Sequence, residues 1–151
     1  MKKAIIFLLT LTVCFSLFSP LAVAATQNDS EYYIEYIGST EETSAIVPFG
    51  TDLRNVTKKF TFKLYSKATG QAIDTLTVTV TGIVSATTKE ARLVDIESTF
   101  ANNLFYIKEK NIFVDSGVIE VADVVYRKSV RGFIFTITYT GAISVEEGIL
   151  S

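Results

Sequence analysis

The chain has 151 residues, of which 48% are hydrophobic and 20% are charged, a composition typical of a folded domain and unlike that of a disordered chain. Its 14 basic and 16 acidic side chains give a net charge of -2, without the basic excess that is usual in nucleic-acid-binding proteins. The length predicts a single domain, and no nucleic acid is expected as a partner.

The first 25 residues have the layout of a secretory signal peptide. Two lysines near the start precede an apolar run, Ala4–Phe18. Pro20 ends this run before it reaches the roughly 20 apolar residues that a membrane span requires. A small-residue cleavage site follows, and cleavage after Ala24 or after Ala25 fits it equally well.

Removal of residues 1–25 leaves residues 26–151 as one exported domain with a frayed N-terminus. The chain's one cysteine, Cys14, leaves with the signal peptide, so the core must stabilise the fold without a disulfide. Cysteine-free exported domains are typical of bacterial exoproteins. We therefore expect a secreted bacterial protein that is released or held non-covalently at a surface, with no stable membrane insertion after cleavage.

The exported part is predicted to consist of short strands. Glu31–Ile37 and Ala45–Phe49 are weak candidates near its start. Lys59–Tyr65 alternates strictly between polar and apolar residues, the pattern of a half-buried strand. Leu76–Thr81 repeats the alternation with threonine on the outer face, and Gly82 then predicts a bulge or bend.

Further strand candidates continue along the second half of the chain. They are Val94–Phe100, Leu104–Ile107, Ile112–Val114, Val118–Tyr126 and Phe133–Thr140. Alternation places Val94 and Ile96 on one apolar face, and the last turn is predicted at Lys128–Gly132.

Turn-forming residues separate the strands at the spacing of an all-β sandwich. The predicted fold class is therefore all-β, a single antiparallel β-sandwich of about eight short strands without a disulfide. The expected strand order is immunoglobulin-like or a related one, although the cysteine and tryptophan landmarks of true immunoglobulin domains are absent. A small β-barrel or a jelly roll is the alternative.

The exported part lacks most side chains that catalyse reactions near neutral pH. Without histidine or cysteine it cannot form a Ser-His-Asp or Cys-His nucleophile, or a zinc site built on those residues. No serine has a lysine three positions later, which is the usual spacing of a Ser–Lys nucleophile. The eight glycines are scattered singly, so a Gly-rich phosphate loop is absent. We expect no enzyme activity and no cofactor.

Several acidic residues are candidates for chemistry. Asp95 and Glu97 lie on one strand face, about 7 Å apart by the strand rise, and could serve a glycosidase, although solvated strand residues are the preferred interpretation. Asp115–Gly117 and Asn28–Glu31 carry oxygen ligands that calcium accepts, but both are ordinary turn sequences, so no metal site is expected. Asp123 falls on an apolar face. We expect either that a bulge turns its side chain outward or that a backbone N–H group donates a hydrogen bond to its carboxylate.

The candidate binding face consists of Lys59, Lys63, Tyr65 and Lys67, which alternation places on one side of a strand. One hypothesis is that this stripe docks an anionic surface polymer. The alternative is that its lysines protect an exposed edge strand from pairing with other chains. The tyrosines clustered at residues 32–36 could form a sugar- or partner-binding surface, or they could pack half-buried on a strand.

Taken together, the sequence predicts a secreted, threonine-rich, non-catalytic β-sandwich. We expect it to bind or coat an extracellular surface component, either a polymer or a protein. The alternative is a small secreted carboxylate-dependent hydrolase that acts on polysaccharide.

Overall fold

The computed structural model describes residues 30–42 and 52–148. Regular structure within these residues is entirely β-strand, arranged as two antiparallel sheets of four strands. The predicted signal peptide (residues 1–25), the strand expected at Ala45–Phe49 and residues Asn28 and Asp29 lie outside the described residues.

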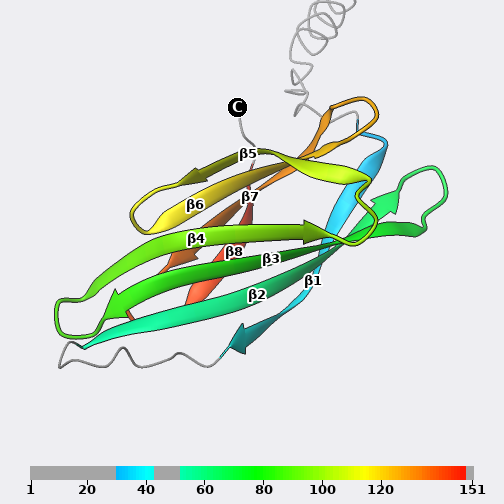
Figure 1. The fold of residues 1–151 in the computed structure, drawn as a ribbon. Coiled ribbons are helices and arrows are strands. Elements are labelled where there is room, and N and C mark those ends of the chain that lie inside the picture. Colours follow the sequence, from blue (N-terminus) through cyan, green and yellow to red (C-terminus); the bar gives the residue numbers. More distant parts are fainter. Residues whose placement is uncertain (1–29, 43–51, 149–151) are drawn as a thin grey trace, which may run out of the picture.

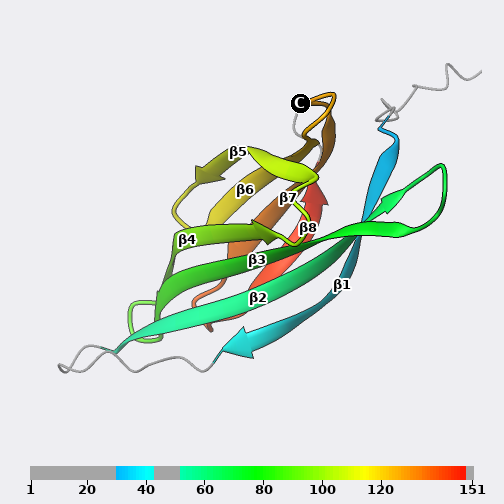
Figure 2. The ribbon, with the colours of Figure 1, turned by 45° about the vertical axis from the view of Figure 1, so that its right-hand side comes forward.

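Each sheet is formed by four strands that are consecutive in the chain. The first sheet contains β1 (Tyr32–Glu42), β2 (Leu53–Ser66), β3 (Ala72–Ser85) and β4 (Glu90–Phe100). The second contains β5 (Phe105–Ile112), β6 (Ser116–Asp123), β7 (Ser129–Ile137) and β8 (Ile143–Gly148). Figures 1 and 2 show the two sheets as two layers. Within each sheet, every strand is hydrogen-bonded to the strands that precede and follow it in the chain, so each sheet is a meander.

This architecture confirms the predicted all-β sandwich. The strand order differs from an immunoglobulin-like one, in which strands distant in the chain lie side by side. The described connections between successive strands of a sheet have three to five residues, which is enough to join antiparallel neighbours.

One hydrophobic core lies between the sheets, formed by every second residue of the long strands. Its largest side chains are Phe60, Phe62, Leu64, Leu76, Phe133 and Phe135. The ring centroids of Phe62 and Phe133 are 4.5 Å apart, and those of Phe60 and Phe135 are 5.3 Å apart, so aromatic contacts join β2 to β7. The alternation predicted for Lys59–Tyr65 on β2 and for Leu76–Thr81 on β3 is therefore confirmed, and within these two stretches it turns the polar residues to the outer face.

A β-bulge interrupts the pairing of β3 with β4, as Gly82 predicts. The register shifts between Thr81 and Gly82, with Val94 as the extra residue on β4. The bulge leaves Val94 47% exposed and buries Leu93 to 2% exposure, so the prediction that Val94 shares the buried face of Ile96 is wrong. Glycine is required at position 82 because a Cβ there would lie 2.9 Å from the carbonyl oxygen of Arg92.

Asp123 ends β6 and closes the turn that follows it. Its buried carboxylate accepts hydrogen bonds from the backbone N–H groups of Tyr126 (2.5 Å) and Lys128 (3.0 Å). Backbone donors thus satisfy this acid, which was one of the two expectations for it. The turn therefore precedes β7, and the prediction of a turn at Lys128–Gly132 is wrong because β7 begins at Ser129.

Candidate functional site

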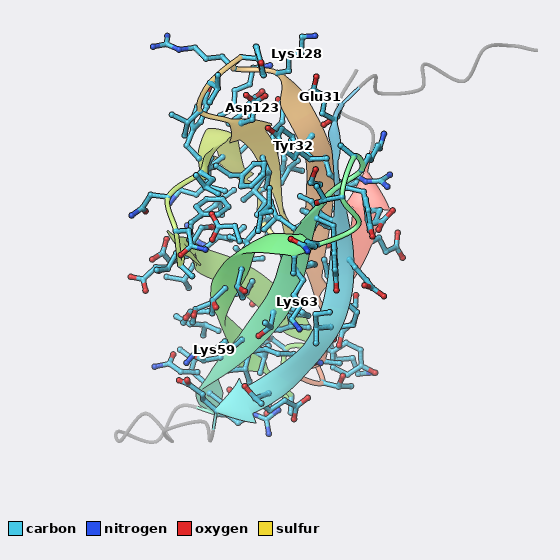
Figure 3. All side chains as sticks on the ribbon, turned by 90° about the vertical axis from the view of Figure 1, so that its right-hand side faces the viewer. Glu31, Tyr32, Lys59, Lys63, Asp123 and Lys128 are labelled. Atoms are coloured by element: carbon cyan, nitrogen blue, oxygen red, sulfur yellow. The ribbon has the colours of Figure 1, made fainter. Side chains whose placement is uncertain are left out.

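The predicted binding residues lie on and just after β2. Lys59, Lys63 and Tyr65 point to the outer face, because the alternating residues between them are buried in the core. Figure 3 shows Lys59 and Lys63 along this part of the sheet. Lys67 follows the last residue of β2, and its backbone N–H donates to the carbonyl oxygen of Glu31 (2.8 Å).

The edge-protection explanation for these lysines is wrong. β2 lies between β1 and β3 and is hydrogen-bonded to both, so it has no free edge to protect. The lysines of β2 therefore need another role, or serve only as solvated outer-face residues.

Acidic residues of β1 balance part of the charge on the β2 lysines. The Lys59 ammonium nitrogen lies 3.1 Å from a carboxylate oxygen of Glu42. Glu35 is the cross-strand partner of Lys63, the position from which opposite charges stabilise a sheet pair. The stripe is thus less cationic than the sequence suggests, and Lys63 and Lys67 are its most exposed members.

Tyr65 is held in a stacked pair with Tyr33 of β1. Their ring centroids are 4.9 Å apart and their planes differ by 7°. Partial burial raises the pKa of Tyr65 above its ordinary value, and a hydrogen bond to Glu35 adds to the effect. Two other tyrosines of β1 face the core, with Tyr32 edge-on to Phe105 and Tyr36 tilted against core rings. Tyr32 and Tyr36 thus show the packing role predicted for the cluster, whereas Tyr33 lies on the outer face with Tyr65, where a binding role stays a prediction.

A row of threonines on β3 extends the candidate face beyond the predicted residues. Its members are half-buried and lie beside the outward residues of β2: Thr75, Thr77, Thr79 and Thr81. Thr79 is the cross-strand partner of Lys59, and the hydroxyl oxygens of Thr57 and Thr81 are 3.3 Å apart. Alternation predicted the orientation of these threonines, whereas their alignment with the lysines follows from the β2–β3 register.

The carboxylates of Asp95 and Glu97 line a groove between β4 and β5. Asp95 accepts a hydrogen bond from the backbone N–H of Ile96 (2.8 Å) and lies 3.7 Å from the Lys110 ammonium nitrogen. About half of each of these two paired side chains is exposed. The Asp95 carboxylate is thus hydrogen-bonded to the backbone of its own strand and paired with Lys110. Such bonds occupy backbone groups of β4, which is an edge strand.

A Ser–Lys pair that the sequence spacing does not reveal lies on the second sheet. The Lys108 ammonium group donates to the Ser129 hydroxyl oxygen (2.8 Å) and to a Glu120 carboxylate oxygen (3.1 Å). Ser129 in turn donates to Glu120. A Ser–Lys nucleophile needs a lysine that accepts the serine proton, whereas here both groups donate to the carboxylate. The arrangement is therefore an ion-pair cluster that joins β5, β6 and β7.

Within residues 30–42 and 52–148, no group of three or more His, Cys, Asp or Glu side chains is placed to hold a metal ion. Asp115 lies in the turn between β5 and β6, where its carbonyl oxygen accepts the backbone N–H of Ile137 (2.9 Å). Of the segment Asn28–Glu31, only Ser30 and Glu31 are described. The described residues also contain no helix with the length and apolarity to span a membrane.

Comparisons with known proteins return no match: no protein-family model, no curated protein and no solved structure matches this chain.

Proposed function

We propose that the protein is a secreted, non-catalytic β-sandwich that binds or coats an anionic extracellular polymer with the outer face of the β1–β4 sheet. The observation that carries this proposal is the row of β3 threonines lying in register beside the lysines of β2. These side chains remain at least partly exposed, and the stacked Tyr33 and Tyr65 adjoin them.

The chemistry of this face favours an extended ligand over a small molecule. Hydroxyl and ammonium groups repeat along the strands every second residue or a multiple of that interval, about 6.6 Å at the least. A polymer with repeating anionic and hydroxyl groups could meet many of them at once. Lys63 and Lys67 supply exposed charge, and the tyrosine pair supplies a rigid aromatic surface, which is common at binding sites.

The carboxylate-dependent hydrolase has weaker support. Its candidate acid, Asp95, is engaged by Lys110 and by the backbone of Ile96. An enzyme of this kind also needs its two carboxyl groups on opposite sides of a bound sugar, whereas Asp95 and Glu97 lie two residues apart on one strand.

A pull-down on purified cell envelopes from which lipid has been extracted, at low and high salt, tests the proposal. The test variant is Lys63→Glu/Lys67→Glu, and the control is Lys89→Glu/Arg92→Glu, which changes the net charge equally at the opposite end of the first sheet. Wild type and control should bind at low salt and be released at high salt, because salt screens exposed charges. The test variant should bind weakly while keeping the wild-type urea midpoint. Equal binding by both variants, or no binding by wild type at low salt, would refute the proposal.

A further inference from the structure

The turn between β6 and β7 exposes apolar side chains at one end of the sandwich. Val124, Val125 and Tyr126 are 48%, 75% and 60% exposed. Leu104, 46% exposed, lies beside them, since its carbonyl oxygen accepts the backbone N–H of Val124 (3.1 Å). These four residues are here called the apolar tip.

Two cations follow the apolar tip directly. Arg127 and Lys128 are both exposed, and Figure 3 shows Lys128 at the extreme end of the molecule, above the buried Asp123. Glu31 is an exposed acid at the same end. The turn itself therefore combines exposed apolar groups with two positive charges.

Two buried aspartates hold the tip in one conformation. Asp123 accepts the N–H groups of Tyr126 and Lys128 and so closes the turn. Asp74, 3% exposed, accepts the backbone N–H groups of Asn102 (2.8 Å) and Leu104 (3.1 Å). Because these bonds already order the backbone, binding through the tip would cost little conformational entropy.

We propose that the apolar tip docks on the surface of an anionic lipid bilayer, with Val125 and Tyr126 at the headgroup boundary and Arg127 and Lys128 against anionic headgroups. Charge complementarity favours an anionic bilayer as the partner, because cations close to a membrane are attracted to anionic lipids. Tyrosine side chains are also enriched at the membrane–water interface. The turn between β5 and β6 provides a contrast within the molecule: it also exposes Phe113, but an acid, Asp115, follows it. Docking of this kind is peripheral and leaves both sheets outside the bilayer.

Co-sedimentation with vesicles tests this contact. The probes are vesicles of phosphatidylcholine with 30% phosphatidylglycerol and vesicles of phosphatidylcholine alone. Wild type should bind the anionic vesicles and be released by salt. Arg127→Glu/Lys128→Glu should weaken binding by at least about 25-fold, because each cation near an anionic surface contributes roughly a factor of five. Val125→Asn, which removes apolar surface without adding charge, should weaken binding about tenfold. Lys89→Glu/Arg92→Glu should bind like wild type.

A local reporter shows which part of the chain meets the lipid. The chain has no tryptophan, so Tyr126→Trp introduces a single tryptophan at the tip, and Tyr139→Trp introduces one beyond the far end of β7; tryptophan emission is excited selectively over that of the tyrosines. Anionic vesicles should shift the emission of the first variant to the blue and leave that of the second unchanged. All variants share the same N-terminal segment, so differences among them report on the tip.

Three results would overturn the inference. One is equal vesicle binding by wild type and the Arg127→Glu/Lys128→Glu variant. Another is the same emission response from both reporters. The third is concentration-dependent self-association of wild type that Val125→Asn abolishes, without any vesicle binding, which would identify the tip as a contact between copies of this chain.

Discussion

The ammonium nitrogen of Lys110 on β5 lies 3.7 Å from a carboxylate oxygen of Asp95 on β4, where the edges of the two sheets meet. The same ammonium group donates to the carbonyl oxygen of Ile96 (3.1 Å), and Asp95 accepts the N–H of Ile96 (2.8 Å). Ile96 lies on the edge strand β4, and both its backbone N–H and its carbonyl oxygen are thus hydrogen-bonded to side chains. Free edges of this kind invite pairing with other chains, so we expect Lys110 to protect β4 in the way that the sequence suggested for the β2 lysines.

Removing this protection should promote association through β4. Lys110→Ala frees the carbonyl oxygen of Ile96 and removes a charge from the edge. Sedimentation velocity should therefore detect dimers and larger species at concentrations where they are absent from wild type. Lys89→Ala, a matched loss of an exposed lysine in the turn before β4, should sediment like wild type. Identical profiles for all three proteins would show that Lys110 does not protect the edge.

Core aromatics should dominate the stability of the sandwich. Phe62 and Phe135 are fully buried, so replacing either with alanine should lower the free energy of unfolding by about 3–5 kcal/mol. Thr79 is on the outer face, and Thr79→Ala should cost less than about 1 kcal/mol. Urea denaturation measures all three. Similar midpoints for the three variants would contradict the burial described for these residues.

How well the sequence predicts this fold depends on the regularity of each strand. Leu76, Val78 and Val80 are buried as alternation predicts, because β3 continues without interruption until Gly82. The exposure of Val94 is not predicted by alternation, because one extra residue in β4 moves every residue beyond it to the opposite face of the sheet. Gly82 predicts a bulge or bend, but the sequence does not show that the extra residue lies on β4, because the packing of β4 on β3 decides it.

The candidate site was predictable to a similar extent. Alternation correctly placed Lys63 and Tyr65 on an outer face, since that depends on local pattern alone. It could not show that Tyr33 stacks on Tyr65, or that Ser129 meets Lys108, because both contacts depend on strand pairing between distant segments. The turn after Asp123 could not be predicted for a related reason. The Asp123 carboxylate accepts backbone N–H groups that would otherwise pair with another strand, and the apolar sequence Val124–Tyr126 gives no sign of these bonds.

Asp74 should contribute more to stability than any exposed acid. Its carboxylate accepts backbone N–H groups from Thr75, Asn102 and Leu104, and it is 3% exposed. Asp74→Ala leaves these donors without their acceptor, so the free energy of unfolding should fall by about 2–3 kcal/mol. Asp115→Ala, at an exposed turn, should change it by less than about 0.5 kcal/mol. Thermal or urea unfolding measures both variants. Equal losses of unfolding free energy in the two would contradict the larger contribution of Asp74.

The N-terminal segment gives a prediction about processing. If residues 1–25 are a signal peptide, the exported protein should begin at Ala25 or Thr26, because the small residues before each position suit the cleavage enzyme. Intact mass spectrometry of protein recovered from the medium of an expressing host measures this directly. Recovery of a species that still carries Lys2 and Lys3 would contradict it.

Asp52 should make the stability depend on pH in a defined acidic range. Its carboxylate accepts hydrogen bonds from the backbone N–H of Thr87 (2.7 Å) and the hydroxyl of Ser85 (2.7 Å), which joins the start of β2 to the turn after β3. Hydrogen bonds from Thr87 and then Ser85 lower the pKa of Asp52 to about 2. A lowered pKa means that the folded state favours the ionised carboxylate. The resulting stabilisation is therefore fully present above the unfolded pKa of about 3.9 and is lost as pH falls toward 2.

Asp52→Asn tests that range of pH, because asparagine keeps the shape of the side chain but cannot ionise. Wild type should exceed this variant in free energy of unfolding by a constant amount above about pH 5, and the difference should shrink between about pH 4 and pH 2. Ser85→Ala, which removes one donor to the carboxylate, should show the same narrowing with a smaller amplitude. Urea denaturation at a series of pH values measures both. A difference between wild type and Asp52→Asn that stays constant down to pH 2 would mean that these hydrogen bonds do not favour the ionised form.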